Sequence, residues 1–245
     1  MERRQEGILT AALKEVLRAD TALHALLQWG TCDVASVIQS HPDSCSFFPE
    51  AAEFKYAIVL ALPLPCSALT DVTTAPTPLY LHHYRQLNYI LDRISYSVAV
   101  MIEENGYDAL SIPASQYVTM SPYPRGAISH RVFAYYAGLG FIGRSRLLIN
   151  RRYGARVRLT TILTNAPIKG DETVPSADSL YDNRNCGDCF RCVQACPAGA
   201  ISASSEKFSL DRCLAKLSEF RKINFIGQHI CGICIKVCPF SGILV

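Results

Sequence analysis

The sequence predicts a mixed α/β (α+β) fold followed by a cysteine-rich C-terminal module, and three observations lead to this prediction. The chain has 245 residues, of which 49% are hydrophobic and 18% charged, so it can bury a sizeable core. Apolar residues recur at helical spacing in some segments and form short continuous runs in others. Eight of the eleven cysteines lie between Cys186 and Cys238. We therefore expect two domains, residues 1–170 and residues 171–245.

The first hundred residues contain two predicted helices and one predicted strand. Apolar side chains at helical spacing predict a helix over residues 8–28, in one or two pieces, with Gly30 as its stop. The apolar run over residues 56–62 suits a buried strand. A second helix begins at Thr77-Pro78, which supplies a capping hydroxyl and a proline for the first turn, and it ends at Asn105-Gly106.

Shorter elements follow in the next sixty residues. They are a strand over residues 107–112, a helix over 129–137 that stops at Gly138, and strands over 147–149 and 156–163 joined by a turn at Tyr153-Gly154. In the last strand, Arg156 and Arg158 alternate with apolar residues. This period of two predicts one solvated face.

Charge and hydropathy exclude several classes of function. The formal net charge of +3 is too small to indicate nucleic-acid binding by itself. The longest apolar run is far shorter than the roughly 20 residues that span a bilayer, and residues 1–7 are charged, unlike the apolar core of a signal peptide. We therefore expect a cytoplasmic protein without a membrane partner. Disulfides are rare in the cytoplasm. The low charged fraction is compatible with a homodimer.

The cysteine spacing is typical of a bacterial ferredoxin. The run from Cys186 to Cys196 has spacings x2, x2 and x3 and is followed by Pro197. In such a run three thiolates surround one iron–sulfur cube, while the fourth reaches a second cube. Cys213 and the run from Cys231 to Cys238, again followed by proline, form the second half.

Exchange of the fourth ligand between the two halves predicts two [4Fe–4S] clusters and uses all eight cysteines. The first cluster is assigned to Cys186, Cys189, Cys192 and Cys238, and the second to Cys196, Cys213, Cys231 and Cys234. Two structural zinc sites are the alternative, but zinc sites rarely combine x2-x2 spacing with Cys-Pro. The remaining three, Cys32, Cys45 and Cys66, have no ligand spacing and are interpreted as buried small hydrophobes.

Further residues resemble the epoxyqueuosine reductase family over roughly residues 105–240. The matching elements are Ala137–Arg144 (AGLGFIGR), Leu163–Pro167 and the split cysteine pattern. The resemblance implies a cobalamin-binding domain related to flavin nitroreductases, whose cobalt receives electrons from two [4Fe–4S] clusters; flavin is the alternative cofactor. It places the cofactor pocket at the glycine-rich element, which makes four residues candidate cofactor contacts: Gly138, Gly140, Gly143 and Arg144.

Other readings of these residues stay open. His130 lies in the first turn of a predicted helix beside the pocket that the resemblance implies, where it is a candidate proton donor or corrin contact; a capping or core-edge histidine is the alternative. The glycines also fit a helix C-cap and a tight turn. Six arginines between residues 144 and 158 suit either an anionic ligand or a solvated strand face.

Two differences from the family bear on the substrate. Members that act on tRNA carry an aspartate general acid at the position matched here by Pro124, and they often extend into helical repeats, whereas this sequence ends six residues after Pro239. We therefore expect a small-molecule or nucleoside substrate rather than tRNA, and an external electron donor of the ferredoxin or flavodoxin type.

The sequence thus predicts an iron–sulfur oxidoreductase that is similar to epoxyqueuosine reductase. Electrons would pass through two [4Fe–4S] clusters to a bound corrinoid or flavin that reduces an organic substrate. The alternative is a non-catalytic electron-transfer or corrinoid-reactivating partner. An iron–sulfur sensor has no DNA-binding element in the sequence to support it.

Overall fold

The structure is a computed structural model that describes residues 2–18, 25–120, 124–168, 180–181 and 183–243. The chain divides into two compact units, each built from three segments. Unit 1 comprises Met1–Leu62, Asn88–Leu139 and Arg158–Ala177, and unit 2 comprises Pro63–Leu87, Gly140–Val157 and Asp178–Val245. The predicted domain boundary between residues 170 and 171 lies outside the described residues.

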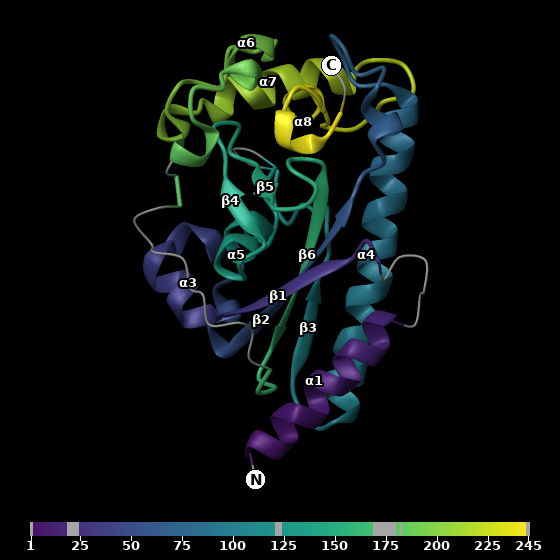
Figure 1. Ribbon diagram of the computed structural model, residues 1–245, viewed down its shortest axis with the longest axis vertical. Coiled ribbons are helices and arrows are strands. Elements are labelled where there is room, and N and C mark those ends of the chain that lie inside the picture. Colours follow the sequence, from purple (N-terminus) through teal and green to yellow (C-terminus); the bar gives the residue numbers. More distant parts are fainter. Residues whose placement is uncertain (1, 19–24, 121–123, 169–179, 182, 244–245) are drawn as a thin grey trace. The chain divides into compact units, whose positions relative to one another are not determined.

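Unit 1 is built on a four-stranded sheet. Its strand order is β1 (Gln28–Asp33), β2 (Tyr56–Pro63), β6 (Val157–Thr164) and β3 (Ala109–Ile112) (Figure 1). The outer pairs, β1 with β2 and β3 with β6, are antiparallel. Backbone bonds from Lys55 N to Thr164 O and from Leu64 N to Arg156 O join opposite ends of β2 and β6, so this pair is antiparallel as well.

Strand β2, one of the two central strands of this sheet, is apolar on both faces. In β2 every residue from 57 to 62 is fully buried, which requires cover on both sides of the strand. On the β3 side, helix α4 (Pro78–Glu104) bonds to the sheet through Ser95 Oγ and Ser111 Oγ, 2.6 Å apart. The strands predicted over residues 56–62, 107–112 and 156–163 are confirmed.

The first predicted helix is correct only in part. Helix α1 (Glu2–Arg18) buries Leu9, Leu13 and Leu17, which lie one above another on one face. Residues 19–24 lie outside the described residues, and residues 28–33 form β1 instead of a helix end. Gly30 is therefore a strand residue and not a helix stop. A Cβ at Gly30 would lie 2.2 Å from the carbonyl oxygen of Ala137, so glycine is needed there for a tertiary contact that local periodicity does not reveal.

Two short helices pack beside β1. Helix α3 (Val34–Ser40) was not predicted; Asp33 caps it by accepting a hydrogen bond from Ser36 N at 2.7 Å. Helix α5 (His130–Tyr136) confirms the helix predicted over residues 129–137 and contacts both β1 and α3 (Figure 1).

The long helix α4 has the predicted ends. Thr77 Oγ1 accepts a hydrogen bond from Tyr80 N at 3.1 Å, Pro78 occupies the first turn, and the chain leaves the helix at Gly106, whose φ is +83°. The described helices include none with the length and apolarity needed to cross a membrane.

Unit 2 contains a two-stranded sheet of β4 (Gly140–Ile142) and β5 (Leu148–Asn150). Strand β5 was predicted, but β4 was not, because the glycine-rich element was interpreted as a turn. The predicted turn at Tyr153-Gly154 exists and is closed by two backbone bonds of 2.9 Å between Asn150 and Gly154. It connects β5 to a strand of the other sheet and does not form a hairpin.

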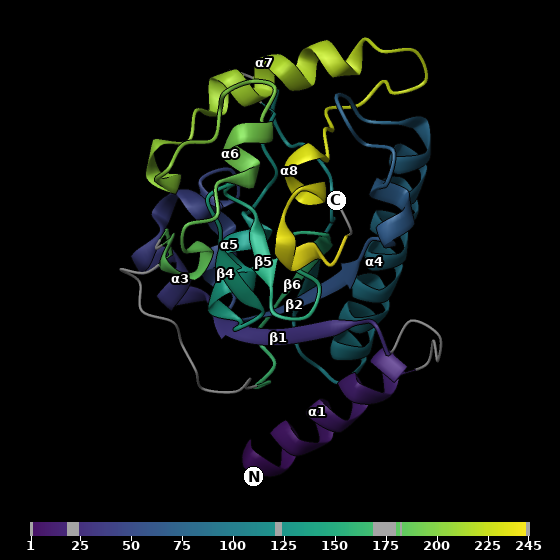
Figure 2. The ribbon, with the colours of Figure 1, turned by 45° about the horizontal axis from the view of Figure 1, so that its top comes forward.

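The rest of unit 2 consists of short helices and loops. Helices α6 (Arg191–Ala195) and α8 (Ile233–Lys236) pack against each other, and α7 (Leu210–Arg221) lies between them in the chain (Figure 2). Gly232 begins α8 with φ +85°, and a Cβ there would lie 2.9 Å from the ring of Tyr80. Its lack of a side chain therefore permits the close packing of α8.

Candidate functional site

Eight cysteines of unit 2 come from the three short helices and the loops beside them. Cys192 lies in α6, Cys213 in α7 and Cys234 in α8. The other five precede or follow these helices: Cys186, Cys189, Cys196, Cys231 and Cys238. All eight are partly buried, and none of the described cysteines forms a disulfide. Their thiols are therefore available as ligands.

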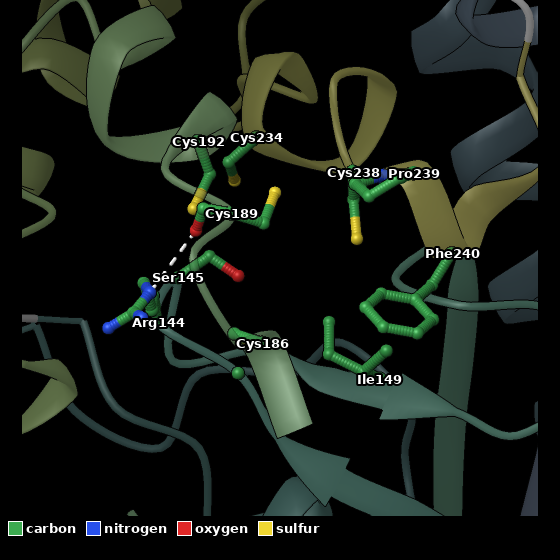
Figure 3. A pocket seen from close by; sticks show the side chains of 11 residues that line it. Arg144, Ser145, Ile149, Cys186, Cys189, Cys192, Cys234, Cys238, Pro239 and Phe240 are labelled. Carbon is green, nitrogen blue, oxygen red and sulfur yellow. Dashed lines mark hydrogen bonds between the residues drawn. The ribbon is translucent and has the colours of Figure 1, made fainter. Parts of the chain in front are cut away.

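One cavity of unit 2 brings the first predicted ligand set together. Its lining includes Cys186, Cys189, Cys192 and Cys238, with Cys234 beside them (Figure 3). Gly143 also lines this cavity, and a Cβ at Gly143 would lie 3.5 Å from Cys186 Sγ. The missing side chain thus leaves room next to a candidate ligand.

Electrostatic neighbours define the same set of four. Burial, together with the thiolate charges of Cys186, Cys238 and Cys189, raises the pKa of Cys192 to about 11. Burial also raises the pKa of Cys238, with further contributions from Cys186 and Cys189. The thiols whose charges act on Cys192 and Cys238 therefore all belong to the first predicted ligand set.

The second set is grouped in the same way. Burial, followed by the charges of Cys231 and Cys196, raises the pKa of Cys213 to about 11. Burial raises the pKa of Cys234 well above its ordinary value, and the charges of Cys231, Cys192, Cys213 and Cys196 add to the effect. Cys234 thus has neighbours in both groups of four, so the two groups adjoin at this residue.

Arg144 faces the first cavity from the turn that follows β4. Its guanidinium donates to the carbonyl oxygen of Cys189 at 3.2 Å (Figure 3). It also donates to the carbonyls of Gly187 and Ala203 and lies over the ring of Phe190. The side chain is 8% exposed. Its role as a cofactor contact stays a prediction, but its described donors are directed at the cysteine loop.

The glycine-rich element serves protein packing at each position where the geometry is described. Gly138 has φ +71° and ends α5 in a Schellman motif, with Leu139 N bonding to Ala134 O at 3.0 Å. A Cβ at Gly140 would lie 2.2 Å from Ile149 O, and one at Gly143 would lie 2.8 Å from the Ile149 side chain. In unit 2 these glycines therefore allow close packing against Ile149, and Gly143 also lines the cysteine cavity. Their role as cofactor contacts stays a prediction.

His130 is held by hydrogen bonds at both ring nitrogens. Nε2 lies 3.0 Å from Pro113 O, which can only accept, so Nε2 carries the proton and Nδ1 accepts from the Thr161 hydroxyl at 2.8 Å. Burial lowers the pKa of His130 to about 4; the Pro113 bond opposes this shift and the Arg158 charge adds to it. The imidazole is neutral at pH 7, which suits the core-edge reading. Its catalytic role stays a prediction.

Arg156 and Arg158 do not form a solvated strand face. Arg156 donates to Leu64 O at 2.6 Å and to Ser241 O at 2.8 Å, and Arg158 donates to Asn88 Oδ1 at 2.8 Å and to Ala114 O at 3.0 Å. Both side chains are half-buried. The prediction that these two residues mark a solvated strand face is thus wrong. Their long side chains instead bond to carbonyl oxygens of segments that are distant in the sequence.

Of the three cysteines outside the spacing pattern, Cys45 fits its interpretation as a buried small side chain, whereas Cys32 and Cys66 are half-buried. Cys45 is 4% exposed. Burial raises the pKa of Cys32, whose thiol donates to Phe133 O at 3.6 Å. Cys66 is half-buried and lies 4.0 Å from the carbonyl oxygen of Ser241.

Cysteine spacing did not point to a second pocket of unit 2. It is lined by residues beside the ligand loop: Asp188, Cys189, Phe190, Arg191, Gln194 and Pro239. The sequence signal that could have indicated this pocket is that its lining residues lie between or next to candidate ligand cysteines. Cys189 and Pro239 line both pockets, so the two pockets lie on neighbouring sides of these residues.

Comparison with known proteins points to the same chemistry. Residues 185–241, which include all eight cysteines, match the family model described as "4Fe-4S double cluster binding domain". An epoxyqueuosine reductase of Synechocystis sp. is 32% identical over 128 residues, which cover 47% of this chain and 40% of that protein. The chain thus matches less than half the length of this relative.

Solved structures share the fold. A reductive dehalogenase whose structure suggests a mechanism for B12-dependent dehalogenation has a TM-score of 0.65 at 19% identity, and the match covers 87% of this chain and 30% of the dehalogenase chain. An epoxyqueuosine reductase solved with an epoxyqueuosine-modified tRNA stem loop has a TM-score of 0.56 at 21% identity and covers 95% and 66%. This chain therefore has an α/β fold like that of reductive dehalogenases, is similar in sequence to epoxyqueuosine reductases over about half of its length, and contains a 4Fe-4S double cluster binding domain at residues 185–241.

Proposed function

We propose that this protein is an iron–sulfur reductase that carries electrons through two [4Fe–4S] clusters to an organic substrate. The observation that carries the proposal is one cavity lined by Cys186, Cys189, Cys192 and Cys238 together with Cys234, whose thiol is in turn influenced by Cys196, Cys213 and Cys231. The first cluster is assigned to Cys186, Cys189, Cys192 and Cys238, and the second to Cys196, Cys213, Cys231 and Cys234.

The residues of both groups fit such clusters. Each group offers four thiols and no competing carboxylate or imidazole among the assigned ligands, as [4Fe–4S] clusters require. Burial and mutual repulsion raise the pKa of Cys192 and Cys213 to about 11, so iron must displace these protons on binding. When bound, the clusters supply one-electron transfer. The chain holds the ligands in place through α6 and α8 and, at Cys234, brings the two groups next to each other.

A corrinoid is supported by fold likeness to the B12-dependent dehalogenase and by the sequence resemblance. The described contacts of the residues assigned to it are with protein groups, because Cβ positions at Gly140 and Gly143 lie against Ile149 and the Arg144 donors bond to carbonyls. We therefore derive no step through a corrinoid. None of the similar proteins described above is named for a flavin.

The proposed substrate is a small molecule or nucleoside. Pro124 has no titratable group, and it stands where the resemblance expects the general acid of tRNA-acting members; residues 121–123 lie outside the described residues. The test compares oxidation of the photoreduced protein by epoxyqueuosine nucleoside with oxidation by the modified tRNA stem loop. Faster oxidation by the tRNA stem loop would contradict this substrate class.

A non-catalytic electron carrier is the second candidate, and His130 favours it. Both of its ring nitrogens bond to protein groups and it is neutral at pH 7, so this predicted acid has no proton free for a substrate. An electron carrier passes electrons to another protein and needs no such proton.

Cofactor content of anaerobically purified protein, supplied with cobalamin, tests these proposals. About eight irons and eight sulfides per chain are expected. Bound cobalt would support the corrinoid reductase, whereas iron with neither cobalt nor flavin would favour the electron carrier. Zinc in place of iron would overturn the cluster assignment.

A further inference from the structure

Arg144 is a buried cation whose contacts concentrate on one ligand loop. Its Nε donates to Cys189 O at 3.2 Å, and its two terminal nitrogens donate to Gly187 O and Ala203 O. Two of these three carbonyls belong to the stretch from Cys186 to Cys189. The guanidinium thus ties that loop to the segment around Ala203, using donors in a rigid planar fork.

The positive charge of Arg144 is not balanced by a described acidic group. Its partners are three carbonyls and the ring of Phe190, whose centroid lies 4.5 Å from the guanidinium carbon. With 8% of its surface exposed, the side chain has little contact with water. It lines the same cavity as the first group of cysteines (Figure 3). A buried, unbalanced cation is costly unless an anion is nearby.

We propose that Arg144 is a positioning residue and counter-charge for the cluster held by Cys186, Cys189, Cys192 and Cys238. This inference rests on the proposed function, because it requires the cluster. An external donor supplies the electron, and the reduced cluster then carries one more negative charge than the oxidised one. Arg144 itself neither accepts nor releases an electron or a proton. Because its positive charge stabilises the reduced cluster more than the oxidised cluster, it raises the reduction potential of this cluster.

The test uses the full chain with its iron. Arg144→Met removes the charge and the hydrogen bonds, and Arg144→Lys keeps the charge without the fork. The matched control is Arg93→Met, because the Arg93 guanidinium also lies over an aromatic ring, that of Tyr89 at 5.9 Å, but the residue is exposed and lies outside the site. Iron per chain is measured, and an anaerobic redox titration followed by electron paramagnetic resonance gives the midpoint potential of each cluster.

In Arg144→Met we expect one cluster to become harder to reduce. At the wild-type midpoint its ratio of reduced to oxidised form should fall about tenfold, which is about 59 mV for one electron, while the other cluster keeps its potential. Arg144→Lys should shift less, and Arg93→Met should shift neither cluster. If Arg144→Met loses one cluster outright, the positioning role is supported. The counter-charge role is then judged from the midpoint potential of that cluster in Arg144→Lys, which should stay closer to the wild-type value than a loss of charge would allow.

Equal potentials in wild type and Arg144→Met, or equal shifts of both clusters, would overturn the inference. A wild-type protein without iron would instead overturn the proposed function, so the two failures are distinguishable.

Discussion

The Thr161 hydroxyl donates to Nδ1 of His130 across 2.8 Å, because Pro113 O already accepts the proton on Nε2. Both partners fix the neutral ring in one tautomer. The protonated ring would lose the Thr161 hydrogen bond as it stands, and burial further disfavours its charge. This arrangement predicts a measurable pH dependence of stability.

The pKa of His130 is about 4 in the folded protein against an ordinary value of 6.5. Between these values the unfolded chain binds more protons, so the free energy of unfolding falls as the pH decreases. From pH 7.5 to 5.5, the wild type should lose about 1 kcal/mol more than His130→Gln. Urea midpoints at the two pH values check this. Equal losses in both proteins would show that His130 titrates normally.

The exchange of fourth ligands can be tested by combining substitutions. Cys238→Ser should lose about half of the iron, and adding Cys186→Ser should remove little more, because both belong to one cluster. Adding Cys213→Ser to Cys238→Ser should remove nearly all of it. Cys45→Ser is the control, since this buried cysteine lies outside the ligand sets. Near-complete loss in the first double variant would contradict the assignment.

In the folded protein without iron, the thiols of Cys192 and Cys213 should react slowly with an alkylating reagent. The pKa of Cys192 and Cys213 is raised to about 11 from 9.0, mainly by burial. Because only the thiolate reacts, both should react about a hundredfold more slowly at pH 8 than in the urea-unfolded chain. Mass spectrometry after timed iodoacetamide treatment measures the rates. Similar rates in the folded and unfolded chain would rule out the raised pKa values.

The same substitution at two glycines should have opposite effects. Gly140→Ala places a Cβ 2.2 Å from the backbone oxygen of Ile149, so the β4–β5 pair must shift, and we expect a loss of more than about 2 kcal/mol. Gly7 lies in α1, and a Cβ added there would meet no heavy atom within 4 Å outside the backbone of its own helix. Gly7→Ala should therefore stabilise the protein by about 0.5–1 kcal/mol. Thermal unfolding of both variants checks the signs, and a neutral Gly140→Ala would show that the strands yield easily.

The sequence by itself determined the features that depend on local pattern. The buried run at residues 56–62, the cap at Thr77-Pro78 and the spacing of eight cysteines were all readable, because continuous apolarity, capping chemistry and ligand spacing act within a few residues. The family resemblance followed from the same short motifs.

Only the tertiary structure decided which distant groups meet. Gly30 was misread as a helix stop because its need for glycine comes from Ala137, a residue far away in the sequence. The contacts of Arg144, Arg156 and His130 likewise join segments far apart in the chain. Such contacts depend on how elements pack, and a one-dimensional pattern carries no record of a neighbour that is remote in sequence.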